Sequence, residues 1–198
     1  MSHFNLMANS WDTPEKIALS AHYADRIRSH LKSKNPAKIL EVGCGTGLLG
    51  ANFLNETSTL LGVDTSKGML DVFNEKFKGL KARSVLLNLE EEELHENNFD
   101  LIISSMAFHH LKNPAAMINK LKKLLAPGGA IAVIDLDAED GTFHPDPANM
   151  GVFHFGFSDE TTRSWGSSAE FKDYSREIVH NIEKNDKLYP LFLAIFLN

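Results

Sequence analysis

The sequence predicts an α/β fold, a doubly wound and mostly parallel sheet with helices on both faces and an antiparallel C-terminal strand. Three observations predict it. Short apolar runs alternate with segments of helical periodicity between residues 36 and 137. The runs are nearly continuous, as in parallel strands buried on both faces. Two further runs near the C-terminus flank a polar turn and predict a hairpin at the sheet edge.

The first element is an arm, Met1 to Asp12, that leads into a helix. Thr13 can cap the helix and Pro14 suits its first position. Apolar residues then recur at helical spacing as far as Leu31, and Asn35-Pro36 stops the helix.

Strands and helices then alternate through the middle of the chain. Helices are expected from Leu48 to Asn55, from Ser66 to about Phe77, and from Pro114 up to Pro127-Gly128-Gly129. The expected strands are Lys38–Val42, Thr59–Val63, Ser84–Leu87, Asp100–Ser104 and Ala130–Leu136.

The alternation of strands and helices ends after Asp137. Residues 138–157 are rich in Phe, His, Pro and Gly, which predicts an ordered loop or lid, and a short helix is expected over Asp159–Trp165. Strands at Glu177–Ile182 and Leu188–Phe196 would pair through the turn between them.

Composition narrows the possible functions. The 198 residues suit one domain, and a net charge of −6 without a basic stripe argues against nucleic acid or an anionic membrane as partner. The single cysteine, Cys44, excludes an internal disulfide and a cysteine-rich zinc site. No secretory signal is visible and the apolar stretch Leu191–Leu197 is too short to span a bilayer, so we expect a cytoplasmic location.

A glycine loop joins the first strand to the next helix. In Gly43-Cys44-Gly45-Thr46-Gly47 the glycines allow positive φ and a close ligand, and the helix start offers free N–H groups. Asp64 ends the following strand about twenty residues on, where a carboxylate can bind a ribose. Gly45, Gly47 and Gly50 also fit the dinucleotide pattern, so a NAD(P)-dependent oxidoreductase stays open at this point.

The wider context favours another cofactor. The segment from Ile39 to Gly47 closely resembles motif I of class I S-adenosylmethionine-dependent methyltransferases, including Glu41, an acidic residue that dinucleotide enzymes usually lack. Asn88-Leu89, the segment Phe99–Leu111 and Pro127-Gly128-Gly129 resemble later motifs in the same order. The resemblance is to small-molecule methyltransferases of type 11/25. It covers residues 36–137 and implies a Rossmann-like fold, with S-adenosyl-L-homocysteine as the cofactor product.

The resemblance also implies roles for single residues. Asp64 would bind both ribose hydroxyls, and Asn88, in place of the commoner Asp, the adenine amino group. Glu41 would assist the ammonium group of the cofactor. The cofactor-binding residues expected in this way are Glu41, Gly43, Cys44, Gly45, Gly47, Asp64, Thr65, Asn88, Leu89, Ser104 and Ser105.

Methyl transfer from a sulfonium depends largely on alignment, and a base is needed only when the acceptor must lose a proton. His110 is the first candidate for a base or an acceptor-orienting group, and His109 the second; both could instead bond the backbone or fill space. Phe153, His154 and Phe155 could line an acceptor pocket or belong to the core. Trp11 and Asp12 could close over the cofactor or simply dock the arm.

No metal site is predicted, because His109, His110, His144 and His154 lack tight ligand spacing, and Cys44 is interpreted as a small loop residue. Ser104-Ser105-Met106-Ala107 stands where amino-directed nucleic-acid methyltransferases often carry D-P-P-Y or N-P-P-Y. This favours a small or medium organic acceptor.

The resemblance implies one methyltransferase domain over residues 1–198. It comprises an N-terminal arm and helix (1–34), a cofactor-binding core (36–137), a lid or acceptor region (138–176) and a strand pair (177–198). A non-catalytic module that binds the cofactor is the alternative. The acceptor, the methylated atom, the use of a base and the oligomeric state are left open by the sequence.

Overall fold

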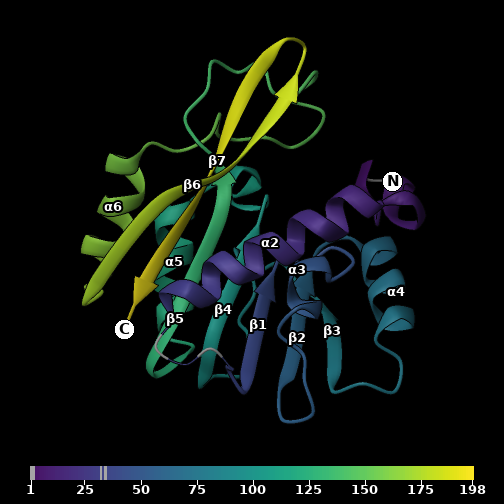
Figure 1. Ribbon diagram of the computed structural model, residues 1–198, viewed down its shortest axis with the longest axis vertical. Coiled ribbons are helices and arrows are strands. Elements are labelled where there is room, and N and C mark those ends of the chain that lie inside the picture. Colours follow the sequence, from purple (N-terminus) through teal and green to yellow (C-terminus); the bar gives the residue numbers. More distant parts are fainter. Residues whose placement is uncertain (1–2, 32, 34) are drawn as a thin grey trace.

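A seven-stranded sheet with strand order β3-β2-β1-β4-β5-β7-β6 forms the centre of the computed structural model, which describes residues 3–31, 33 and 35–198 (Figure 1). The first five strands are parallel and β7 is antiparallel to both of its neighbours. This confirms the predicted fold class. The strands are β1 (Lys38–Val42), β2 (Thr59–Asp64), β3 (Ala82–Leu86), β4 (Phe99–Ser105), β5 (Leu125–Leu136), β6 (Asp173–Lys184) and β7 (Lys187–Leu197).

Helices cover both faces of the sheet (Figure 1). Three of them begin with the signals expected from the sequence, because Thr13, Ser66 and Asn113 each accept a hydrogen bond from a backbone N–H of the first helical turn. The helices are α1 (His3–Met7), η1 (Ala8–Ser10), α2 (Pro14–His30), α3 (Leu48–Ala51), α4 (Lys67–Lys76), η2 (Phe108–His110), α5 (Pro114–Lys122) and α6 (Asp159–Ser168).

Alternation along each strand produces two buried layers. On one face, Ile39, Leu101 and Ile103 pack with Ile27 of α2 and Phe73 of α4. On the other face, neighbouring strand residues pack with Met117, Ile118 and Leu121 of α5 and with Trp165 of α6. The parallel strands are therefore buried on both sides, as their continuous apolar runs predicted.

The C-terminal hairpin lies at one edge of the sheet, as predicted. Strand β7 is the inner strand of this hairpin, between β5 and β6, and β6 forms the edge. Residues Leu191–Phe196 are nearly inaccessible to solvent, so this strand contributes to both layers. The far end of the hairpin extends beyond the sheet (Figure 1), where Lys184 and Tyr189 hold the loop that follows β5.

Several element boundaries differ from the prediction. Helix α3 is a single turn that ends at Ala51, and α5 ends at Lys122, before Pro127-Gly128-Gly129. Those three residues lie within β5, next to a register shift in its pairing with β4. Among the described residues, no helix combines the length and the apolarity that crossing a membrane requires.

Candidate active site

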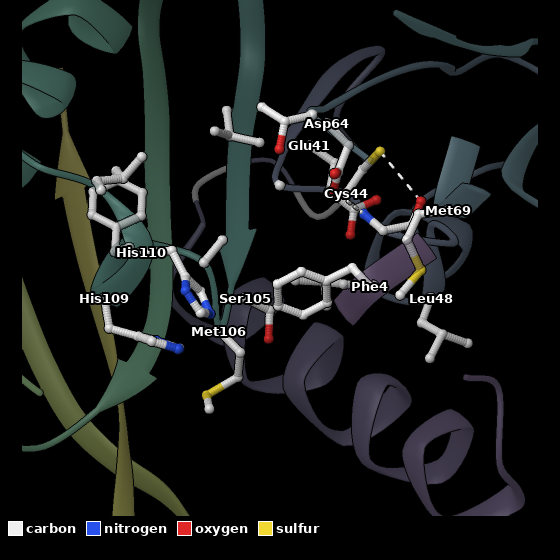
Figure 2. A pocket seen from close by; sticks show the side chains of 18 of the residues that line it. Phe4, Glu41, Cys44, Leu48, Asp64, Met69, Ser105, Met106, His109 and His110 are labelled. Atoms are coloured by element: carbon white, nitrogen blue, oxygen red, sulfur yellow. Dashed lines mark hydrogen bonds between the residues drawn. The ribbon is translucent and has the colours of Figure 1, made fainter. Parts of the chain in front are cut away.

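One cavity of about 700 Å³ opens at the carboxyl ends of β1, β2 and β4. The strand order reverses between β1 and β4, which is where open α/β sheets bind ligands. The glycine loop, the N-terminal arm and the segment after β4 contribute to its lining (Figure 2). The loop after β5 also contributes to it. These parts come from distant points of the sequence.

The glycine loop is held against β2 and β4. The N–H groups of Gly43 and Cys44 donate to the Val63 carbonyl at 2.8 and 3.1 Å. Gly43 has φ +64°, and a Cβ there would lie 2.4 Å from the Cβ of Ala107. No larger residue fits at this turn without displacing the segment that carries the candidate histidines.

Asp64 bridges the glycine loop and the start of α4. Its two carboxylate oxygens accept hydrogen bonds from the N–H groups of Gly45 and Ser66, both at 2.8 Å. A carboxylate offers about four acceptor positions, so both oxygens can still accept from a ligand. Burial raises the pKa of Asp64 against the opposing effect of these bonds. Two hydroxyl donors would therefore stabilise its charge further.

Glu41 is almost completely buried at the end of β1, and its Oε2 accepts from the Gly50 N–H at 3.1 Å. Desolvation raises the pKa of Glu41 to about 8, although that bond and the charge of Lys76 act in the opposite direction. A cationic ligand group beside Glu41 would favour its ionised form.

Most of the predicted cofactor residues line the cavity together. They are Glu41, Gly43, Cys44, Gly45, Asp64, Thr65, Asn88, Leu89 and Ser105. Two of the predicted residues are absent from the lining. Gly47 packs against Phe73 and Phe77, and the buried hydroxyl of Ser104 donates to the Val42 carbonyl at 2.8 Å.

Cys44 is buried, and desolvation raises its pKa well above the ordinary value, so the thiol stays protonated. Its Sγ lies close to the position where a Cβ on Gly62 would stand. These contacts agree with the interpretation of Cys44 as a small residue that packs within the glycine loop.

The N-terminal arm both docks and contributes to the cavity. Asp12 accepts from the Thr46 hydroxyl and from the Lys76 ammonium, each at 2.5 Å, which ties the arm to the glycine loop and to α4. Phe4 and Trp11 line the cavity and contact one another edge to face. Figure 2 shows Phe4 lying across the space between the loop and the histidines.

His109 has a partner that the sequence reasoning missed. Its Nδ1 lies 2.6 Å from Oδ1 of Asp135, at the end of β5, and both side chains are almost fully buried. The same carboxylate accepts from the N–H groups of Phe108 at 2.9 Å, of His109 at 3.3 Å and of Leu136 at 2.7 Å. Asp135 could have been identified from the sequence, because it is a carboxylate near the end of an apolar strand that was expected to border the site.

His110 and His144 complete a histidine cluster on the cavity wall. His110 Nδ1 lies 2.9 Å from the Gly151 carbonyl, and its ring packs edge-on to Phe4. Burial lowers the pKa of His110, with a contribution from His109. Burial also lowers the pKa of His144 to about 4, aided by the charges of His109 and His110. Both rings are therefore neutral near pH 7 and keep a lone pair on nitrogen.

The later aromatic residues separate into two groups. Phe143, His144 and Phe153 line the cavity, whereas His154 and Phe155 are absent from its lining. The His154 ring packs on Phe157, and its buried Nε2 has no hydrogen-bond partner in the described part of the chain.

Comparisons with known proteins agree with this geometry. A model of the family described as methyltransferase domain matches residues 40–131. An uncharacterised methyltransferase of Schizosaccharomyces pombe is 37% identical over 138 residues, which are 62% of this chain and 49% of that protein. The ubiquinone biosynthesis O-methyltransferase of Photobacterium profundum is 30% identical over 139 residues, 66% of this chain and 59% of that protein. The matched region thus spans about half the length of these relatives.

A solved structure shows the same fold at low sequence identity. The plantazolicin methyltransferase BpumL, in complex with a desmethyl-plantazolicin analogue and S-adenosylhomocysteine, superposes with a TM-score of 0.70 at 15% identity. The superposition covers 98% of this chain and 88% of that one. The fold is an α/β fold of the Rossmann-like kind, with one cavity at the carboxyl ends of its parallel strands. Residues 40–131 match the methyltransferase-domain family, and the chain resembles class I S-adenosylmethionine-dependent methyltransferases in sequence and in fold.

The residues present fit the cofactor of that family. Two carboxylates, the buried Glu41 and the partly buried Asp64, face the glycine loop, which suits a ligand with hydroxyl donors and positive charge better than a pyrophosphate. A Cβ on Gly45 would meet only the Met69 sulfur, at 3.9 Å, so the loop leaves room for a ligand at its backbone. The acceptor oxygens of Asp64 and the amide of Asn88 complete the polar set.

Proposed function

We propose that this chain transfers a methyl group from S-adenosylmethionine to a small or medium organic acceptor. One observation carries the proposal: a single cavity joins Asp64 and Asn88, on the cofactor side, to His109 and Phe153 on the other side. Two ligands in one enclosed space are what a transfer between them requires. The lining is largely apolar with a few convergent polar groups, as in small-molecule sites.

The cofactor half is assigned to the predicted residues that line the cavity. S-adenosylmethionine supplies a methyl group on a sulfonium, open to in-line attack by the acceptor. Asp64 would accept hydrogen bonds from the ribose hydroxyls. It would use the carboxylate lone pairs that do not already accept from the N–H groups of Gly45 and Ser66. Asn88 would bond the adenine edge, and Glu41 would lie near the ammonium group.

The acceptor half is assigned to η2 and to the loop within residues 138–176. His109 and His110, fixed by Asp135 and Gly151, would orient the acceptor, and Phe143 and Phe153 would enclose it. The net charge of −6 and the lack of a basic track in the sequence argue against nucleic acid. The relative from Photobacterium is named for ubiquinone biosynthesis, which agrees with a small organic acceptor.

Titration calorimetry with S-adenosylhomocysteine tests the cofactor assignment. The wild-type chain should saturate with one ligand, and Asp64→Ala should weaken binding at least tenfold, because a partly buried acceptor of two hydrogen bonds is lost. Asp71→Ala is the matched control, since Asp71 is an exposed aspartate of α4 paired with Lys67. Saturation by NAD or NADP in place of the sulfonium compound, or equal affinities in Asp64→Ala and wild type, would contradict the proposal.

Transfer itself is tested separately from binding. Labelled S-adenosylmethionine is incubated with the protein and with the small-molecule fraction of cell extract. Label should move into that fraction, and Asp64→Ala should transfer at least tenfold less. Tight cofactor binding without transfer to any acceptor would support the alternative of a non-catalytic cofactor-binding module.

A further inference from the structure

Three histidines from two separate segments meet on the cavity wall. His109 and His110 belong to η2, and His144 comes from the loop after β5. Their ring centroids lie 4.1 Å (His109–His110), 4.9 Å (His109–His144) and 6.0 Å (His110–His144) apart. One nitrogen of each lies within 4.8 Å of the others. Figure 2 shows the rings of His109 and His110 pointing into the same space.

The hydrogen bonds of two rings determine which nitrogen keeps a lone pair. A backbone carbonyl cannot donate, so the bond to Gly151 requires the proton of His110 on Nδ1 and leaves a lone pair on Nε2. Asp135 already accepts three backbone N–H groups, so its bond with His109 likewise requires the proton on Nδ1. A histidine whose other ring nitrogen donates to a carboxylate or carbonyl is the usual arrangement around a metal ion.

His144 is also fixed in place. It is only 9% exposed, and no hydrogen bond from the chain described here reaches its ring. Its loop is tied to the hairpin by Thr142 with Tyr189 at 2.8 Å and by Lys184 with the Phe143 carbonyl at 2.6 Å. The positive charge of Lys184 is thereby held on that carbonyl, and the buried carboxylate of Asp135 lies behind the cluster.

We propose that His109, His110 and His144 bind a divalent transition-metal ion of the Zn²⁺ class, with an open coordination position that faces the cavity. Three imidazoles and one open position are a donor set that zinc accepts in catalytic sites. Metal–nitrogen bonds of about 2.0–2.1 Å place tetrahedral ligand nitrogens about 3.3 Å apart, so each nitrogen moves inward by about 1 Å. Small rotations about the side-chain torsions supply this movement.

The open position has a chemical consequence. It takes an anionic or ionisable atom of the acceptor, such as the oxygen of a hydroxyl or the sulfur of a thiol. The positive ion would lower the pKa of that atom, whose proton would pass to water. The resulting anion would attack the methyl carbon while the carbon–sulfur bond breaks and S-adenosylhomocysteine leaves. This role of the ion rests on the proposed function, whereas metal binding by the three histidines does not.

Zn²⁺ competition against a chromophoric chelator, with the purified full chain, tests the site. The wild type should bind one Zn²⁺ per chain, and Co²⁺ should give the visible bands of tetrahedral coordination. His144→Ala and His110→Ala should weaken Zn²⁺ binding at least a hundredfold, and Asp135→Asn about tenfold to a hundredfold. His22→Ala removes an exposed histidine of α2 and should leave the affinity unchanged.

Thermal melting and S-adenosylhomocysteine affinity are measured on the same variants. His144→Ala should melt as a folded protein and retain the wild-type cofactor affinity while it loses Zn²⁺. The metal site would be refuted if folded His144→Ala kept the wild-type affinity for Zn²⁺. It would also be refuted if His144→Ala lost no more Zn²⁺ affinity than His22→Ala. Zn²⁺ binding without cofactor binding would refute the proposed function and leave the metal site standing.

Discussion

Two carboxylates at the glycine loop, the buried Glu41 and the partly buried Asp64, couple the stability of this protein to pH. Burial raises the pKa of Glu41 to about 8, so the native state holds a proton that the unfolded state releases above its pKa near 4.5. The stabilisation from this proton is complete below pH 4.5 and is lost as the pH rises to about 8. Asp64, whose pKa is also raised, acts in the same direction.

We predict that Glu41→Gln flattens the pH dependence of unfolding. Glutamine can still accept from the Gly50 N–H but cannot ionise. Between pH 5 and 8 the wild type should lose up to about 1.4 kcal/mol per pH unit through Glu41, and the variant should lack this component. Urea denaturation at several pH values measures it, with the exposed Glu75→Gln as control. Equal slopes in Glu41→Gln and wild type would refute the prediction.

At the same scale, the sequence predicted which residues line the cavity better than it predicted the side chains that contact them. Glu41, Asp64 and Asn88 lie in motifs of fixed spacing, and the fold places them on one cavity. Asp135 and His144 could not be assigned in this way, because they meet His109 only through the pairing of β4 with β5 and the loop that follows. The preference for His110 over His109 rested on the motif, which carries no information about the buried carboxylate.

Among the elements, the turn between β1 and α3 is tightly constrained. Gly43 combines a left-handed φ with contact to Ala107, so two separate effects oppose any larger side chain. Gly79, after α4, has a similar φ of +79° but nothing within 4 Å of its Cβ position. Comparing the two positions separates backbone strain from close packing.

We predict that Gly43→Ala destabilises the fold more than Gly79→Ala. The left-handed conformation should cost about 1–2 kcal/mol at both positions. Contact with Ala107 should add about 1–3 kcal/mol at Gly43, because the neighbouring chain must move. Chemical denaturation measures both free energies of unfolding. Equal losses of unfolding free energy in the two variants would mean that the segment after β4 moves aside without destabilising the fold.

Element types were predictable, and boundaries less so. The caps at Thr13, Ser66 and Asn113 fix helix starts through local hydrogen bonds, which sequence encodes directly. Pro127-Gly128-Gly129 was wrongly expected to end a helix, because the pairing of β5 with β4 and β7 decides where that strand begins. Glycine and proline indicated an irregularity in the secondary structure, and the pairing between strands determined that it is a register shift within β5.

For the whole molecule, the last strand joins the two buried layers. Phe196 of β7 is fully buried and contacts the rings of Phe171 and Tyr174. Leu193 and Ile195 of the same strand enter the opposite layer. The sequence correctly predicted an antiparallel final strand and a hairpin at the sheet edge. The unbroken apolar run Leu191–Leu197 was the indication that this strand lies inside the sheet.

We predict that Phe196→Ala lowers the free energy of unfolding by about 3–5 kcal/mol, since it leaves a cavity between β7 and α6. Leu188→Ala, at an exposed position of the same strand, should change it by less than about 0.5 kcal/mol. Urea denaturation monitored by circular dichroism gives both values. A loss below about 1 kcal/mol in Phe196→Ala would show that β7 is not integral to the core.

The position of β7 also constrains the order in which the nascent chain assembles on the ribosome. Strand β6 emerges first, yet its sheet neighbour is β7, which emerges afterwards and separates it from β5. Until β7 is synthesised, the edge of β5 exposes unpaired backbone groups and apolar side chains. A chaperone that shields exposed strand edges during translation would therefore act longest on this half of the protein.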